Sequence, residues 1–278
     1  MKEIFDNLSS NFSKDITKRY STSFSLGILF LDKKYRQPIY NVYGFVRLAD
    51  EIVDSFHQFN KKELLERFRQ NTYEAIHEGI SLNPILNSFQ ETVNTFNIDE
   101  ELIGTFLDSM EMDLQKLEYQ QVLYEKYILG SAEVVGLMCL KIFTEGDEKL
   151  FQDLKPFAMR LGAAFQKVNF LRDLKDDVQD LGRSYFPGFA INGFTHADKK
   201  NIEAEIEEDF NQALQGIKLL PGGSRRGVYL AYYYYKNLFH KIRRASLDKV
   251  LSNRIRIPNS HKFLLMVNSY LRHQLNLL

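Results

Sequence analysis

The chain has 278 residues, of which 44% are hydrophobic, and it balances 36 Lys and Arg against 36 Asp and Glu. This suffices for one large folded domain, and the absence of a basic excess argues against a nucleic-acid-binding protein. The single Cys139 cannot form a disulfide within the chain, and no run reaches the roughly 18 uncharged apolar residues of a membrane span. We therefore expect a cytoplasmic protein, at most peripheral to the inner face of a membrane.

Helical spacing of apolar residues runs through the whole chain, and no segment shows the period-two alternation of a strand. The second expected helix begins near Pro38, because proline suits the first turn of a helix. Without an internal repeat or a low-complexity linker, residues 1–278 are expected to form a single all-α domain. Helices are predicted at 3–19, 38–56, 61–79, 83–96, 99–117, 121–144, 147–181, 197–216, 224–252 and 259–275, with a turn at 20–24.

The segment 166–187 ends one of these helices and is rich in acids and arginines. At about 100° per residue, one narrow stripe of this helix is polar and the opposite side is apolar. Acids at positions i and i+4 repel each other, and a bound cation would remove that cost. An ordinary surface helix shows the same two-sided pattern, so this segment alone leaves both interpretations open. The polar stripe consists of Gln166, Asn169, Asp173 and Asp177.

A second acidic helix favours the ligand interpretation. Arg47, Asp50 and Asp54 share one face, and the helix before them is apolar or aromatic nearly all round, which is typical of a buried helix. Carboxylates at the end of a buried helix need compensation, because unpaired buried charge is very costly. A structural salt bridge to Arg47 would supply part of it and remains the alternative.

Two helices that each carry an Asp-x-x-x-Asp pair and an arginine suggest one shared site. Carboxylate oxygens are hard ligands, so Mg²⁺ is the natural cation, with Mn²⁺ as a substitute. Arginine adds nothing to the binding of a bare metal, but it recognises phosphate bidentately. The pattern therefore predicts a Mg²⁺-dependent site that ionises an activated diphosphate.

The runs Asp50-Glu-Ile-Val-Asp54 and Gln166-x-x-Asn-x-x-Arg-Asp-x-x-x-Asp-x-x-x-x-Gly-Arg-x-Tyr-x-Pro187 resemble the two signatures of the phytoene synthase and squalene synthase family, most like its bacterial phytoene synthases. The turn at 21–24 and the helix containing Tyr127 resemble further segments of that family. The resemblance covers residues 17–190 well and the rest weakly.

The resemblance implies an isoprenoid-synthase-type helical bundle with a central apolar cavity, active as a monomer or homodimer. It implies the head-to-head condensation of two prenyl diphosphates, such as two geranylgeranyl diphosphates to phytoene in carotenoid biosynthesis. It assigns the metal to Asp50, Asp54, Asp173 and Asp177, and catalysis to Tyr127, Arg172, Arg183 and Tyr185. It assigns substrate and diphosphate binding to Ser21, Ser23, Arg47, Gln166, Asn169, Tyr235 and Arg254.

Several points stay open. Synthesis of squalene or dehydrosqualene from farnesyl diphosphate is the first alternative; reduction to squalene needs NADPH, for which we see no site and which we do not expect. A non-catalytic relative is the second, although the four aspartates are retained. Tyr235 belongs to a run of four tyrosines that interhelical packing also explains. The basic run 236–244 fits either a solvated helix face or contact with anionic lipid.

Overall fold

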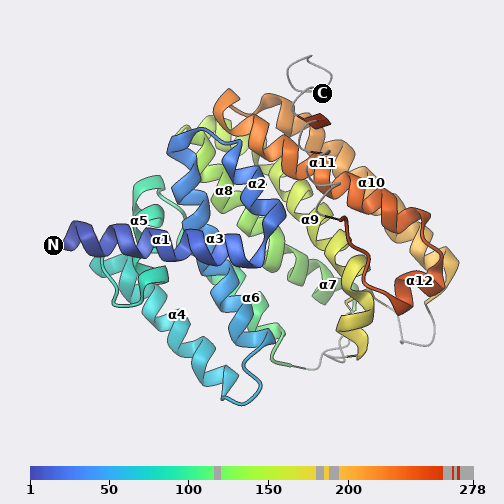
Figure 1. Ribbon diagram of the computed structural model, residues 1–278, viewed down its shortest axis with the longest axis horizontal. Coiled ribbons are helices and arrows are strands. Elements are labelled where there is room, and N and C mark those ends of the chain that lie inside the picture. Colours follow the sequence, from blue (N-terminus) through green and yellow to red (C-terminus); the bar gives the residue numbers. More distant parts are fainter. Residues whose placement is uncertain (116–119, 180–184, 188–193, 259–264, 266–267, 270–278) are drawn as a thin grey trace.

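The computed structural model of the protein describes residues 1–115, 120–179, 185–187, 194–258, 265, 268 and 269, and every regular element among them is helical. Figure 1 shows their arrangement. The α-helices are α1 (Lys2–Tyr20), α2 (Thr22–Leu29), α3 (Lys33–Asp54), α4 (Lys61–Glu78), α5 (Pro84–Phe96), α6 (Glu100–Met112), α7 (Gln121–Ile128), α8 (Val134–Thr144), α9 (Glu148–Gln179), α10 (His196–Leu219), α11 (Gly222–Arg244) and α12 (Leu247–Ser252). A π-helical turn, η1 (Leu129–Glu133), joins α7 to α8.

Local sequence signals fix many helix ends. The Asn83 side chain accepts hydrogen bonds from two backbone amides at the start of α5, where Pro84 takes the first helical position. Thr195 and Asp198 form a reciprocal capping box at the start of α10. Gly79 ends α4 with φ +70°, a left-handed conformation that glycine adopts at little cost.

Three predicted boundaries were wrong. The predicted turn at 20–24 contains the start of α2, which the Ser21 side chain caps by accepting from the Phe24 amide at 3.2 Å. Helix α3 begins five residues before Pro38, which therefore lies inside the helix. The predicted helix 224–252 is interrupted between α11 and α12, where Ala245 is extended. The predicted helix 259–275 lies largely outside the described residues.

The helices surround a central space. Helix α9 packs against α8, η1 and α10, while α1 packs against α3 and α5. In Figure 1, α3, α8 and α9 run through the middle of the molecule and the other helices lie around them. Aromatic contacts fix part of this core: Phe45 of α3 stacks on Phe89 of α5, with ring centroids 3.9 Å apart. The predicted all-α bundle is confirmed.

One continuous stretch of the described helices, Gln121–Thr144, is long and apolar enough to cross a membrane by composition. Inside the molecule, 56% of its most apolar window is buried. It includes α8, which lines the central cavity, so its apolar character is that of a core helix.

Candidate active site

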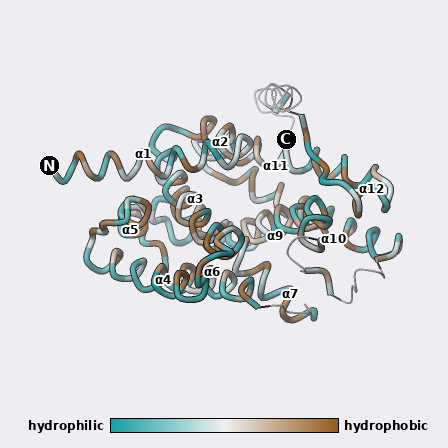
Figure 2. Tube along the Cα trace, turned by 60° about the horizontal axis from the view of Figure 1, so that its bottom comes forward, coloured by the Kyte–Doolittle hydropathy of each residue, from teal (hydrophilic) through white to brown (hydrophobic). Residues whose placement is uncertain are grey.

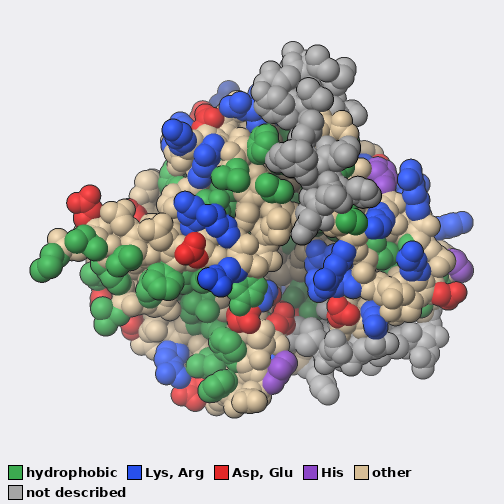
Figure 3. All heavy atoms as spheres, in the orientation of Figure 1, with side chains coloured by type: hydrophobic (Ala, Val, Ile, Leu, Met, Phe, Trp, Pro, Cys, Tyr) green, Lys and Arg blue, Asp and Glu red, His purple; other side chains and the backbone are tan. Residues whose placement is uncertain are grey.

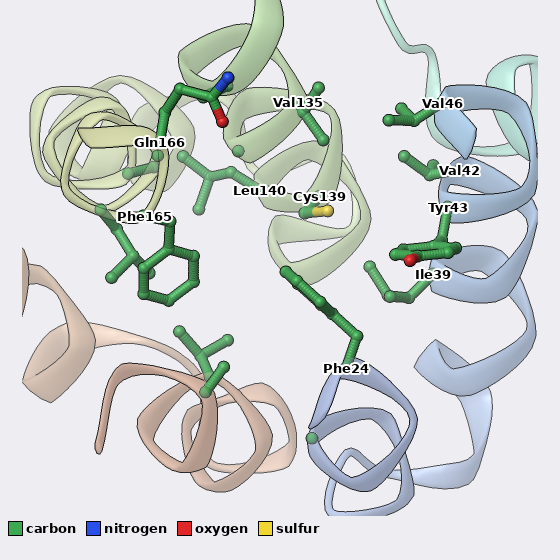
Figure 4. Close-up of a pocket in the computed structure, with 18 of the residues that line it drawn as sticks. Phe24, Ile39, Val42, Tyr43, Val46, Val135, Cys139, Leu140, Phe165 and Gln166 are labelled. Atoms are coloured by element: carbon green, nitrogen blue, oxygen red, sulfur yellow. The ribbon is translucent and has the colours of Figure 1, made fainter. Parts of the chain in front are cut away.

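A cavity of about 370 Å³ lies between α2, α3, α8, α9 and α11. Figure 4 shows its aliphatic and aromatic walls: Val42, Tyr43 and Val46 of α3 face Val135 and Cys139 of α8, with Phe24 projecting from α2. Burial among these side chains raises the pKa of Cys139 to about 12, so its thiol stays protonated at neutral pH. The polar lining residues include Arg47, Asp50, Tyr127, Ser131, Gln166, Asn169 and Tyr235.

On α3, Arg47 lies close to the carboxyl groups of Asp50 and Glu51, and the first two of these three residues line the cavity. Arg47 forms ion pairs with both Asp50 and Glu51, which lie three and four residues further along α3. Although 34% of the Asp50 side chain is accessible, the surrounding protein raises its pKa to about 7, through burial first and then through the nearby carboxylates of Asp54 and Asp113. Burial and the neighbouring carboxylates therefore outweigh the opposing effect of Arg47 on the pKa of Asp50.

Near the C-terminal end of α9, the carboxylate of Asp173 is paired with two arginines. Arg172 donates from Nε to Asp173 Oδ1 at 2.9 Å, and Arg254 Nε lies 2.7 Å from the same oxygen. A second contact of 3.7 Å joins Arg254 to Asp176. The neighbouring carboxylate of Asp173 raises the pKa of Arg172, which stays charged. Asp173 is thus held by two guanidinium groups that a phosphate would also attract.

Amide and phenol groups continue this polar surface into the cavity. The Tyr235 hydroxyl donates to Asn169 Oδ1 at 3.3 Å, and the Asn169 amide nitrogen lies 3.5 Å from Gln166 Oε1. The Tyr235 ring stacks on Phe165, with centroids 4.0 Å apart. Tyr235 is therefore both a packing residue and a cavity-lining residue.

Asp113, which the sequence reasoning missed, joins two of the predicted catalytic tyrosines. Tyr127 donates to Asp113 Oδ2 at 2.7 Å, and Tyr185 donates to Asp113 Oδ1 at 3.1 Å. The two tyrosine rings lie 4.9 Å apart, and Tyr185 also stacks on Phe170. Asp113 directly follows α6 and is only 7% exposed. No spacing in the sequence relates it to either tyrosine.

The π-helical turn η1 lies next to Tyr127 and shifts the residues that follow. At Gly130 a Cβ atom would lie 2.6 Å from the Thr105 carbonyl oxygen, so only glycine permits this close approach to α6. The extra residue per turn allows Tyr127, Ser131 and Ala132 all to line the cavity. Single π-helical turns within α-helices are frequent at functional sites.

The other predicted residues lie around this lining rather than in it. The Ser21 side chain caps α2, and neither it nor Ser23 lines the cavity. Arg183 and the side chain of Asp177 lie outside the described part of the chain. Within that part, no group of three or more carboxylate, imidazole or thiol side chains is close enough to hold a metal ion.

The donor chemistry nevertheless fits a hard divalent cation. Asp50 and Asp54 are one helical turn apart, and their mutual repulsion in a partly desolvated position raises the pKa of Asp50. A cation between them would remove this repulsion, and carboxylate oxygens are the ligands that Mg²⁺ prefers.

Comparison with known proteins agrees with this geometry. The model of the squalene/phytoene synthase family matches residues 17–261, so the chain belongs to that family. It is 26% identical over 251 residues to phytoene synthase 1 of Solanum lycopersicum, covering 82% of this chain and 60% of that protein. It is 30% identical over 189 residues to presqualene diphosphate synthase of Sinorhizobium fredii, covering 66% of this chain and 65% of that protein. The chain thus spans less than two thirds of the length of each.

The fold comparison is closer than the sequence comparison. A crystal structure of a dehydrosqualene synthase superimposes with a TM-score of 0.83 at 20% identity and covers 97% of this chain and 98% of its own. The two chains share the whole all-α architecture, and the cavity therefore lies within the isoprenoid-synthase-type fold predicted from the sequence.

Proposed function

We propose that this chain catalyses the head-to-head condensation of two prenyl diphosphates, and that its substrates are two geranylgeranyl diphosphates and its product phytoene. The observation that carries the proposal is one apolar, aromatic-lined cavity whose polar lining brings together Arg47 and Asp50 of α3 with Gln166 and Asn169 of α9. An apolar cavity suits a prenyl chain, and the aromatic rings around it favour a carbocation. Membership of the squalene/phytoene synthase family supports the reaction type.

In the proposed reaction one substrate loses its diphosphate and leaves an allylic carbocation. A double bond of the second substrate attacks that carbon, and loss of one proton closes a cyclopropane ring. The cyclopropyl diphosphate then loses its own diphosphate, rearranges and loses a second proton. Two diphosphates and two protons leave for each hydrocarbon formed, without any reductant, so NADPH is not required for phytoene.

We assign the metal to Asp50, Asp54, Asp173 and Asp177. Mg²⁺ held there supplies positive charge to the leaving diphosphate. The guanidinium groups of Arg47, Arg172 and Arg254 bind the same diphosphate oxygens as fixed cations. Because Asp173 now holds two of these arginines, a ligand that engages Asp173 would release them to the diphosphate.

The tyrosine pair is placed to handle the released protons. The Tyr127 hydroxyl directs its own proton to Asp113, and its ring lines the cavity. We propose that the Tyr127 oxygen accepts a proton from a bound carbocation while Asp113 takes the phenol proton. Tyr185 donates a hydrogen bond to the other oxygen of Asp113, and its ring packs against that of Tyr127.

The test is incubation of the purified chain with labelled C15 and C20 prenyl diphosphates, with and without Mg²⁺ and NADPH, followed by identification of the hydrocarbon. Phytoene from the C20 substrate, dependent on Mg²⁺ and independent of NADPH, is the expected result. Absence of turnover with both substrates would refute the condensation.

The alternative substrate is farnesyl diphosphate. It is favoured by the 30% identity to a presqualene diphosphate synthase, which exceeds the identity to the tomato phytoene synthase over a shorter region. A C30 product from the C15 substrate, with no product from the C20 substrate, would replace phytoene by this alternative and leave the reaction type intact.

A further inference from the structure

In helix α1, hydroxyl residues are buried and large apolar residues are exposed. Its buried side consists of the small hydroxyl residues Ser9, Ser13 and Thr17, each 0% exposed. Its outer side carries Ile4 and Leu8, 64% and 53% exposed, and a Phe one turn further. A helix on the surface of a globular protein normally shows the opposite arrangement.

Close packing explains the small residues of the inner side. The Ser13 hydroxyl is 2.7 Å from the Ser88 hydroxyl of α5. A Cβ atom on Gly44 of α3 would lie 2.7 Å from Ser13 Oγ, so the two helices approach as closely as their backbones allow. Small and hydroxyl residues at such contacts are typical of helices in lipid surroundings, where the large apolar residues point outward.

Packing does not explain the outer side. Ile4, Leu8 and Phe12 follow one another at four-residue intervals and form a single stripe, which we call the outer stripe. In Figures 1 and 2, the N-terminal half of α1 projects beyond the helices beside it. Figure 3 shows hydrophobic side chains gathered along α1 on this face. The outer stripe therefore contributes nothing to the core and faces a different environment.

Basic residues follow the outer stripe toward the C-terminal end of α1. Lys18 and Arg19 are exposed, and neither forms an ion pair with any residue in the described part of the chain. Exposed basic residues beside an apolar helix face match the combination of anionic headgroups and acyl chains at a lipid surface. Five further charged residues lie on the same helix, namely Lys2, Glu3, Asp6, Lys14 and Asp15, which excludes a membrane span and fits a helix lying in the interface.

The end of α1 also adjoins the active site. Tyr20, the last residue of α1, is exposed, and the Arg47 guanidinium lies over its ring at 4.2 Å from the centroid. Tyrosine is enriched at the level of lipid headgroups, where one end of the ring is apolar and the other is hydrated. From Ile4 to Tyr20 the helix measures about 24 Å, so a helix lying on a membrane would bring the polar end of the cavity to the lipid surface.

From these observations we infer that α1 is a membrane-docking helix: the outer stripe inserts into a bilayer with anionic lipids, and Lys18 and Arg19 contact its headgroups. A second copy of the chain is a poorer occupant. Three partly exposed side chains present on the order of 300 Å² of apolar surface, whereas stable protein interfaces bury about 800 Å² per partner. The inference concerns binding alone and does not depend on the proposed reaction.

The experiment compares sedimentation of the full chain with vesicles of phosphatidylcholine alone and of phosphatidylcholine with phosphatidylglycerol. Replacement of the outer stripe by Gln (I4Q/L8Q/F12Q) should weaken binding to the anionic vesicles at least tenfold. The matched control, F59Q/L82Q/V122Q, removes three apolar side chains that are at least as exposed, from other surfaces, and should bind like the wild type. Charge reversal in K18E/R19E should remove most of the preference for anionic vesicles.

Circular dichroism checks that each variant keeps its helical content, which the exposure of the replaced side chains leads us to expect. Equal vesicle binding of the outer-stripe variant and the control would overturn the inference. So would a dimer of the wild type in sedimentation velocity, without vesicles, that the outer-stripe variant abolishes. Vesicle binding is measured without turnover, so failure here leaves the proposed condensation untouched.

Discussion

The two acidic helices of the site differ in how their charge is balanced. On α3, one arginine faces a group of carboxylates, and Asp50 has a pKa raised to about 7. On α9, two arginines hold the single carboxylate of Asp173. The same Asp-x-x-x-Asp spacing therefore occurs in two different electrostatic environments.

This difference assigns different tasks to the two sides. On α3 the pKa of Asp50 is raised, through burial first and then through Asp54, so a cation bound beside these two carboxyl groups would relieve their repulsion. Arg172 of α9 and Arg254, which follows α12, both pair with Asp173, and in the proposed reaction they would become available to a diphosphate when Asp173 turns to a metal ion. Four measurements can distinguish these tasks: the turnover rate, KM, the pH dependence of metal binding, and stability.

The largest expected effect is on turnover. Asp50→Asn and Asp173→Asn each remove one carboxylate from the proposed metal site and should lower kcat at least 100-fold, the scale on which loss of one electrostatic catalytic group acts. Asp176→Asn is the matched control, because Asp176 neighbours the site and contacts Arg254 at 3.7 Å but is not a proposed ligand. Steady-state assays with labelled substrate measure all three; a near-normal rate for Asp50→Asn would mean that the metal is misplaced.

Arg254→Ala should act on binding more than on chemistry. It removes one of the two guanidinium groups at Asp173, and we expect KM to rise roughly tenfold, the value of one charge-assisted hydrogen bond. Arg256, two residues further along the chain, is exposed, and Arg256→Ala should leave KM unchanged. A KM for Arg254→Ala equal to that of the wild type would remove Arg254 from diphosphate binding.

The pH dependence of metal binding should distinguish the two sides. The pKa of Asp50 lies near 7, so below that pH a proton competes with the cation. Mn²⁺ affinity, measured by calorimetry, should fall by about tenfold from pH 8 to pH 6. In Asp50→Asn this dependence should flatten, while Asp173→Asn should retain it. An identical pH profile for the wild type and Asp50→Asn would contradict the assignment.

The smallest effect is on the free energy of unfolding, and it should have opposite signs in Asp50→Asn and Asp173→Asn. The folded-state pKa of Asp50 exceeds its ordinary 3.8, so its favourable contribution is present below about pH 4 and is lost as the pH rises to 7. At pH 8 without divalent ions, Asp50→Asn should raise the free energy of unfolding by about 1 kcal/mol, a value reduced by solvent screening at the accessible part of the side chain.

Asp173→Asn leaves two arginines without their shared partner and should lower the free energy of unfolding by about 1 kcal/mol. Urea unfolding at pH 8 and pH 4.5 measures both variants, and the gain of Asp50→Asn should vanish at the lower pH. A loss of stability in both variants at pH 8 would show that the two sides are electrostatically alike.

Much of the fold could be predicted from the sequence, because apolar periodicity dominates in long amphipathic helices such as α4 and α5. Helix α2 was missed because it has only eight residues and its cap, Ser21, lies in a run typical of a turn. The break between α11 and α12 occurs at Ala245, an excellent helix former, and its local signal is a single residue, Ser246, whose side chain caps α12 by accepting from the Lys249 amide.

The site was predicted unevenly for a similar reason. Arg47 and Asp50 follow helical spacing within α3, and Gln166 and Asn169 do so within α9. The structure places all four in the lining of one cavity. Asp113 is joined to its tyrosine partners only by the packing of separate helices, and no local pattern marks such a residue.

Helix α9 runs without interruption past the whole cavity, from Leu154 in its lining to the acid pair at its C-terminal end. The distance from Leu154 to Asn169 along the helix is about 22 Å. A continuous helix is stiff, so the depth of the apolar compartment and the position of the polar residues at the C-terminal end of α9 cannot change independently. A prenyl tail that is too long for the compartment would displace its own diphosphate from the arginines. The length of the tail would then affect the reaction rate as well as the binding affinity.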